Sequence, residues 1–130
     1  MEHIYRFLLI VFLTSTGANP LLAQWIQANS PGGGYVEYLA TSGTTIIAGC
    51  SNGAFYSSNG GGTWSTGLGT EGIDVRAIVP VETDLLAGTS LFRNFVSTDN
   101  GSTWTKTNTG FTGTSVWCYA VKDSEVLANR

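Results

Sequence analysis

SSNGGGTW (57–64) and STDNGSTW (97–104) are two nearly identical stretches of this sequence, and they stand 40 residues apart. Both have Ser at the first position, Asn or Asp at the third, Gly at the fifth, Thr at the seventh and Trp at the eighth. We call them the first octet and the second octet. Because the same pattern recurs at a fixed distance, the pair indicates an internal repeat, which has to be identified before strands or helices are assigned.

The repeat extends upstream of both octets. Each copy contains two apolar segments in the same order. The first segments are VEYLAT (36–41), VRAIVP (75–80) and VWCYAV (116–121). The second segments are TTIIAG (44–49), TDLLAG (83–88) and DSEVLAN (123–129). The sequence therefore contains two full units of about 40 residues and the beginning of a third.

Each unit predicts four short strands separated by turn residues. In the second unit the expected strands are 75–80, 84–88, 92–97 and 102–108. Four strands in about 40 residues are typical of a β-propeller blade, and no comparable helical period follows residue 23. We predict an all-β, incomplete β-propeller of four-stranded antiparallel blades. The expected blades are 33–72 and 73–112, with a partial blade at 113–130.

The residues of the octets suit a tight, self-bonded turn. An amide or carboxylate at the third position can accept hydrogen bonds from N–H groups of its own turn, and Asp99 should do so more strongly than Asn59. The fifth-position glycines permit backbone angles that a side chain would penalise. The Trp side chains are expected to fill the gap between turn and sheet. The residues assigned to this structural role are Ser57, Asn59, Gly61, Thr63, Trp64, Ser97, Asp99, Gly101, Thr103 and Trp104.

The octets resemble the Asp-box repeat, S-x-D-x-G-x-T-W. That repeat lies on the turn between the third and fourth strands of blades in sialidase-like, sortilin-like and photosystem-assembly-factor-like propellers. The resemblance covers most of residues 33–130 and implies a secreted bacterial repeat protein with many such units.

Residues 1–23 differ from the rest of the chain. Arg6 precedes the apolar run FLLIVFL (7–13), and small residues follow it, which is the pattern of a secretory signal peptide. The run is far shorter than the roughly 20 residues that span a bilayer, so no membrane span is expected in the mature chain. We predict cleavage after Ala23, with Ala18 as the second choice, and a secreted, cell-surface or periplasmic location.

Trp25 stands 11 residues before Val36, as Trp64 stands 11 residues before Val75. It therefore corresponds to the end of a unit. We predict that residues 24–32 contain an N-terminal, ring-closing strand, with Gln24 to Gln27 in the outer strand of a last blade. Propellers have about 4–8 blades, so further blades or further copies would be needed to complete a ring, and a gene fragment is the preferred explanation.

Several function classes are disfavoured by the residues present. Setting Arg6 and Glu2 aside, five Lys/Arg and eight Asp/Glu remain, so no basic surface for nucleic acid is expected. The single His, His3, lies in the expected signal peptide, which leaves nucleophilic triads without a base. Calcium takes about six to eight oxygen ligands, and the first octet has no carboxylate, so we predict neither metal nor cofactor.

Cys50 and Cys118 are predicted to be two buried free thiols. Export would also permit a disulfide between them, so their oxidation state stays open at this point.

The sequence favours a non-catalytic binding or scaffold module for an unknown protein or carbohydrate. Contacts are expected from loops at one rim, where Tyr35, Phe111 and Trp117 are candidates. The alternative for each of them is a place in the core, where aromatic residues near strand starts usually lie. One alternative is a fragment of a sialidase- or xyloglucanase-like glycoside hydrolase whose catalytic residues lie outside this chain. Sialidases need an arginine triad, a Tyr/Glu pair and a further acidic residue. After the signal peptide this sequence has only Arg76, Arg93 and the terminal Arg130, and it has no Arg-Ile-Pro motif near its start. Another alternative is an assembly factor for a membrane complex.

Overall fold

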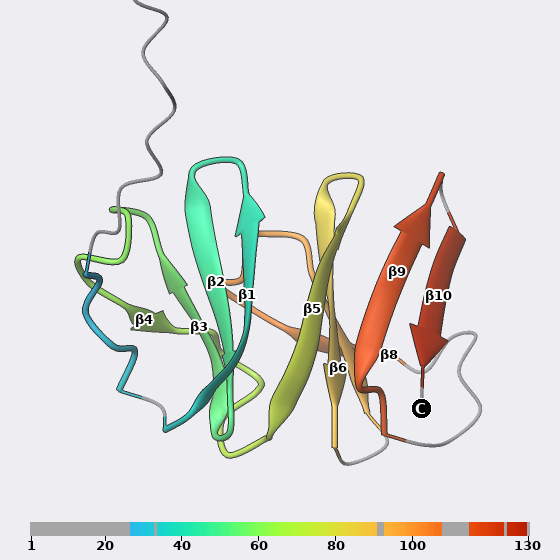
Figure 1. The fold of residues 1–130 in the computed structure, drawn as a ribbon, viewed down its shortest axis with the longest axis horizontal. Coiled ribbons are helices and arrows are strands. Elements are labelled where there is room, and N and C mark those ends of the chain that lie inside the picture. The colour runs from blue at the N-terminus through green and yellow to red at the C-terminus, as the bar shows by residue number, and fades with distance from the viewer. Residues whose placement is uncertain (1–26, 33, 91–92, 108–114, 124, 130) are drawn as a thin grey trace, which may run out of the picture.

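The computed structural model describes residues 27–32, 34–90, 93–107, 115–123 and 125–129. Within these ranges the chain is all-β: ten strands form three antiparallel sheets, and there is no helix (Figure 1). The described part accordingly offers no helix long and apolar enough to cross a membrane. The predicted signal peptide, Trp25 and Phe111 lie outside the described residues.

The two complete units each form one sheet, with the strands in sequence order. The first sheet contains β1 (Val36–Ser42), β2 (Thr45–Cys50), β3 (Gly53–Ser57) and β4 (Ser65–Thr66). The second sheet contains β5 (Val75–Val81), β6 (Asp84–Thr89), β7 (Asn94–Ser97) and β8 (Thr105–Thr107). The third sheet pairs β9 (Cys118–Lys122) with β10 (Glu125–Asn129).

The fourth strand of the second sheet is shorter than the predicted 102–108, because β8 begins only at Thr105. The reason is that the preceding residues bond to the connection that follows β4: the Trp104 N–H donates to the Leu68 carbonyl, and Leu68 forms an isolated parallel bridge with Thr103. The end of the octet therefore joins two sheets rather than extending one.

The first two strands of every sheet pair in the same register. Tyr38 lies opposite Gly49 in the first sheet, and Ala77 lies opposite Gly88 in the second. In the third sheet Cys118 lies opposite Asn129. The turns match as well, because Gly43, Glu82 and Asp123 all have a positive φ, of 57°, 55° and 56°. The repeat seen in the sequence is thus a repeat of backbone geometry.

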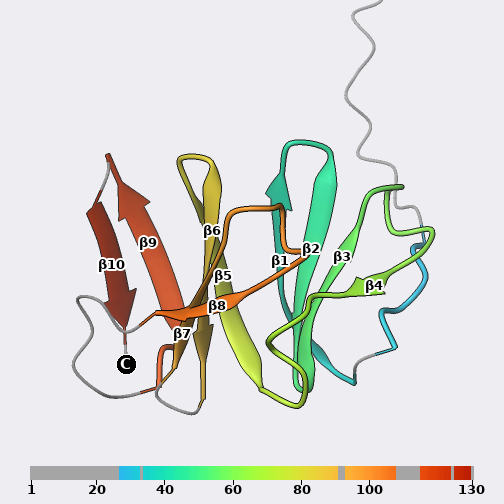
Figure 2. The same ribbon diagram turned by 180° about the vertical axis from the view of Figure 1, so that it is seen from behind.

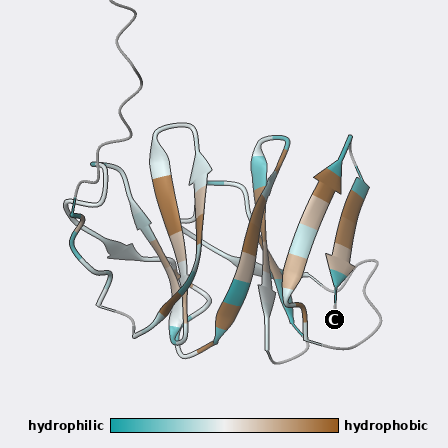
Figure 3. Ribbon diagram, viewed as in Figure 1, coloured by the Kyte–Doolittle hydropathy of each residue, from teal (hydrophilic) through white to brown (hydrophobic). Residues whose placement is uncertain are grey.

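The three sheets stand side by side, with β1, β5 and β9 adjacent along one side of the molecule (Figure 1). Seen from behind, β4 and β8 lie on the opposite side (Figure 2). Apolar residues recur on β2, β5, β9 and β10 (Figure 3). The main core lies between the first and second sheets, and its fully buried side chains include Ile47, Val75, Ile78 and Leu85. Burial of this apolar surface is what holds adjacent sheets together.

Candidate functional site

Each octet forms a turn closed by its own side chains. The Ser57 hydroxyl donates to Asn59 Oδ1 at 2.9 Å and accepts from the Gly61 N–H at 2.9 Å. The second octet repeats both bonds at 2.8 Å, from Ser97 to Asp99 Oδ1 and from the Gly101 N–H to Ser97. Gly61 and Gly101 have φ of 86° and 88°, values that a residue with a side chain rarely adopts.

The third-position side chain of each octet also binds the seventh residue. Asn59 Oδ1 accepts from the Thr63 N–H at 2.9 Å, and Asp99 Oδ1 accepts from the Thr103 N–H at 2.8 Å. The threonine hydroxyls differ in role. Thr63 Oγ1 accepts from the Asn59 amide at 2.9 Å, whereas the Thr103 hydroxyl donates to Asp99 Oδ2 at 2.6 Å. The second octet therefore has an ionic acceptor with two charge-assisted bonds from one residue.

Hydrogen bonding changes the pKa of Asp99. Burial acts to raise it, but the bonds from the Thr103 side chain and backbone and from Ser97 act in the other direction. The net result is a pKa below the ordinary value of 3.8. The ionised carboxylate is therefore the form that the folded turn prefers.

We expect acid to weaken the second octet selectively. Because the folded pKa of Asp99 is lowered, its contribution to the free energy of unfolding is complete above the unfolded pKa and is lost as pH falls through the folded pKa. Asp99→Asn should therefore reduce the pH dependence of stability as pH falls from about 5 past the ordinary pKa of 3.8 and below it, measured by urea unfolding. Asn59→Asp, the converse change, should increase it. Equal pH profiles for wild type and Asp99→Asn would contradict this assignment.

The indole of the second octet is buried between two sheets. Trp104 is only 5% exposed, and its Nε1–H donates to the Gly101 carbonyl at 3.0 Å. The connection after β4 covers it closely: a Cβ placed on Gly67 would lie 2.7 Å from Trp104 Nε1. The Leu68 N–H donates to the Ser102 carbonyl at 3.0 Å and fixes that connection. Trp104 thus joins the second octet to the first sheet.

The indole of the first octet is less well covered. Trp64 is only partly buried, because no sheet precedes it in the described residues, and the segment 27–30 lies there instead. Its Nε1–H donates to the Asn29 carbonyl at 2.6 Å, and the Asn29 N–H donates to the Gly61 carbonyl at 3.1 Å. The Asn29 amide also donates to the Gly62 carbonyl at 2.7 Å. Asn29, which the sequence pattern did not single out, therefore covers the first octet as Leu68 covers the second.

The predicted ring-closing strand, Gln24 to Gln27, lies almost entirely outside the described residues, which begin at residue 27. Residues 27–32 contain no strand. In this segment the bonds of Asn29 run to the turn of the first octet.

A second group of residues lies where β1, β5 and β9 begin. We define the aromatic rim as Tyr35, Asp74, Arg76 and Trp117. Tyr35 is 82% exposed, while Ser51 fixes its backbone: the Tyr35 N–H donates to Ser51 Oγ at 3.2 Å, and its carbonyl accepts from the Ser51 N–H at 3.0 Å. An exposed aromatic side chain on an anchored backbone is available for contact.

Trp117 and Arg76 form a stacked pair in the aromatic rim. Trp117 is 57% exposed, and the Arg76 guanidinium carbon lies 4.0 Å from its ring centroid. Asp74 Oδ2 accepts from Arg76 Nε at 2.8 Å and lies 2.8 Å from Nη2. Asp74 Oδ1 is buried and has no hydrogen-bond partner among the described residues. The carboxylate and the indole together fix the plane of the guanidinium.

The stacked pair follows from the repeat. Strand β5 has a register shift between Val75 and Ala77, and β1 has the same shift between Val36 and Tyr38. Arg76 occupies this irregular position in β5, and bulges of this kind redirect a side chain. Trp117 stands directly before Cys118, as Arg76 stands before Ala77, so the two side chains meet between adjacent strands.

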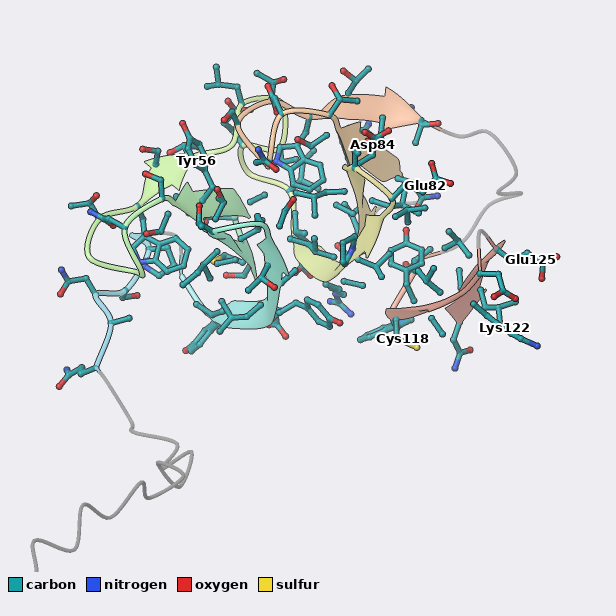
Figure 4. All side chains as sticks on the ribbon, turned by 90° about the horizontal axis from the view of Figure 1, so that it is seen from above. Tyr56, Glu82, Asp84, Cys118, Lys122 and Glu125 are labelled. Atoms are coloured by element: carbon teal, nitrogen blue, oxygen red, sulfur yellow. The ribbon has the colours of Figure 1, made fainter. Side chains whose placement is uncertain are left out.

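One prediction about the cysteines is wrong. Both thiols are free, but only Cys50 is buried, whereas Cys118 is exposed. Cys118 begins β9 in the third sheet, at one end of the molecule (Figure 4). In the described residues no further sheet covers the face to which Cys118 belongs.

The two thiols should differ in reactivity. Burial, and then the negative charge of Glu37, raise the pKa of the Cys50 thiol, which disfavours the reactive thiolate. We expect an aromatic disulfide reagent to label Cys118 alone in the folded chain and to label Cys50 only after unfolding. Counting released thiolate before and after adding denaturant measures this, and Cys118→Ser should abolish the native signal.

Acidic side chains gather at the turns, and Glu82 and Asp84 also line a cavity beside Leu85, Leu86 and Val126. Glu82 and Asp84 flank the β5–β6 turn, and Glu125 pairs in register with Lys122 at the β9–β10 turn (Figure 4). Among the described residues, no three His, Cys, Asp or Glu side chains are grouped so that they could hold a metal ion.

Comparisons of the chain with family models, with curated proteins and with solved structures found no match.

Proposed function

We propose that this chain is an exported, non-catalytic binding module built from Asp-box β-propeller blades, and that the aromatic rim contacts its ligand. The observation that carries the binding role is the exposed Trp117, stacked on an Arg76 that Asp74 holds in place.

The chemistry of the aromatic rim suits molecular recognition. Trp, Tyr and Arg are the residues that most often dominate binding energy, because they combine large contact area with few rotatable bonds or a planar donor group. The Tyr35 and Trp117 rings are exposed to water in the free chain. A ligand that covered these rings would gain the free energy of burying their apolar surface. Since Arg76 is already fixed by two neighbours, little side-chain entropy is lost when it binds.

The propeller interpretation has its own support. The two complete sheets each contain four strands in sequence order, and the octets lie between the third and fourth of them. The register of the first two strands recurs in all three sheets. In the proposed assignment the sheets are blades, and β1, β5 and β9 are their inner strands. The octet residues stabilise the blade corners and take no part in ligand binding.

The ligand is proposed to be a protein or a carbohydrate chain. Native gel electrophoresis tests whether the ligand is a carbohydrate. Native gels containing soluble starch, xylan, glucomannan or xyloglucan should retard the wild-type chain in at least one case. Trp117→Ala and Tyr35→Ala should abolish that retardation, whereas Leu127→Ala, an exposed apolar residue outside the aromatic rim, should not. Release of reducing ends from the retarding polysaccharide would contradict a non-catalytic role.

Binding to a protein is tested with a crosslinking residue placed in the aromatic rim. A photo-crosslinking phenylalanine analogue introduced at position 35 should link the exported chain to one partner in its native culture, and the same analogue at position 127 should not. If neither polysaccharide nor protein binding depends on Tyr35 and Trp117, the proposed role of the aromatic rim is wrong.

Export is proposed from residues 1–23 and is tested separately. N-terminal sequencing of the chain recovered outside the cytoplasm should begin at Gln24. An intact Met1 in that fraction would contradict cleavage of a signal peptide.

A further inference from the structure

The two interfaces between adjacent sheets use the same contact. In each, a glycine at the end of the second strand lies against the first strand of the next sheet. A Cβ placed on Gly49 would lie 2.9 Å from the Val75 carbonyl oxygen and 3.0 Å from Val75 Cγ1. A Cβ placed on Gly88 would lie 2.8 Å from Val116 Cβ and 2.9 Å from the Tyr119 hydroxyl oxygen. The 2.9 Å distance to the Val75 carbonyl oxygen and the 2.8 Å distance to Val116 Cβ are too short for a real Cβ, so any residue but glycine would force these atoms to shift.

We call the face that contacts the preceding sheet the leading face. In the second sheet it carries Val75 and Ile78, which are 0% and 1% exposed. By register, the corresponding residues of the first sheet are Val36 and Leu39. They are 42% and 60% exposed. The first sheet therefore presents the same apolar surface that the second sheet buries.

The opposite, trailing face of the third sheet is also open among the described residues. It carries Leu127, which is 59% exposed, and Asn129. Asn129 pairs with Cys118 as Gly88 pairs with Ala77, so it occupies the glycine position of the repeat. An apolar leading face and an apolar trailing face in one chain would invite head-to-tail association of copies.

We propose that Asn129 prevents this association, and that the leading face of the first sheet accepts only a sheet of this repeat with glycine at that position. If the third sheet of one copy packed on the first sheet of another as Gly88 packs on Val116, the Asn129 Cβ would overlap Val36. The barrier is the Cβ itself, because the overlap is with a neighbouring Cβ or main-chain atom that cannot rotate away. The partner that fits is therefore another antiparallel sheet of this type, and a second copy fits only when residue 129 is glycine.

Sedimentation velocity on the full chain tests the proposal. Wild type and Asn129→Ala should sediment as monomers, since both retain a Cβ. Asn129→Gly should form concentration-dependent oligomers, with an association constant about tenfold to hundredfold above that of Asn129→Ala. Adding Leu39→Glu to Asn129→Gly should return it to a monomer. Near-ultraviolet circular dichroism matching wild type verifies that each variant is folded.

Mixing two variants tests which face of each chain takes part in the association. In the double variant Asn129→Gly/Leu39→Glu the trailing face can associate, but Glu at position 39 blocks the leading face. In the wild type the leading face can associate, but Asn129 blocks the trailing face. Mixed together, they should form a complex of two chains and nothing larger. Three results would overturn the proposal: a monomeric Asn129→Gly, an Asn129→Ala that associates as strongly as Asn129→Gly, or a wild-type oligomer that Leu39→Glu dissociates.

Discussion

Trp104→Ala is expected to lower the free energy of unfolding by about 3–5 kcal/mol. The side chain is 5% exposed in the core between the first and second sheets, and the change would leave a cavity beside Gly67 that neither sheet can close. Such a loss is a large part of the stability of a small domain. Urea unfolding followed by circular dichroism measures it.

Trp64→Ala provides the matched control, because Trp64 occupies the same octet position but is only partly buried. Its expected cost is no more than about 2 kcal/mol, since solvent already reaches the ring and the segment 27–30 is its main cover. Equal losses for the two variants would contradict the difference in burial between the two indoles. A loss below about 1 kcal/mol for Trp104→Ala would contradict its place in the core.

Ile78→Ala is the second large effect, with an expected loss of about 2–5 kcal/mol. Ile78 is 1% exposed and lies against Gly49 in the interface between the first two sheets. Leu39 holds the equivalent position in the first sheet but is 60% exposed. Leu39→Ala should therefore change stability by no more than about 0.5 kcal/mol. Thermal and urea unfolding of both variants measure the difference, and a comparable loss for the two would mean that the first sheet is also covered.

Much of the backbone arrangement could be predicted from the repeat. The period of 40 residues, the apolar segments and the turn residues together predicted the first two strands of both complete sheets and the third strand of the second sheet, because these signals are local and recur. The bonds within each octet were also accessible, since a short polar side chain beside a Gly-rich turn has few other partners.

Contacts between units could not be predicted in the same way. Nothing local to Asn29 indicates that it covers the first octet, because its partners, Gly61 and Gly62, are more than 30 residues away. The difference between Trp64 and Trp104 likewise depends on which segment lies against each ring, and the two octets are almost identical in sequence. The exposure of Cys118 was misjudged for the same reason, since burial of a strand depends on whether another sheet packs on it.

The aromatic rim lies between these cases. Tyr35 and Trp117 were candidates for a loop contact, although their positions near strand starts are more typical of core residues, and the stacking of Arg76 on Trp117 was not predictable. That contact depends on the irregular register at Arg76 and on the spacing between β5 and β9, both of which are tertiary features.

The central claim is that the two octets are equivalent architectural corners, each fixed by its own hydrogen bonds and covered by the segment before it. A nuclear Overhauser spectrum of the folded chain tests it most directly. The account predicts cross-peaks from the Trp104 indole N–H to the Gly67 protons and from the Trp64 indole N–H to residue Asn29. Indole signals without either set of cross-peaks, or with contacts to unrelated parts of the chain, would contradict it.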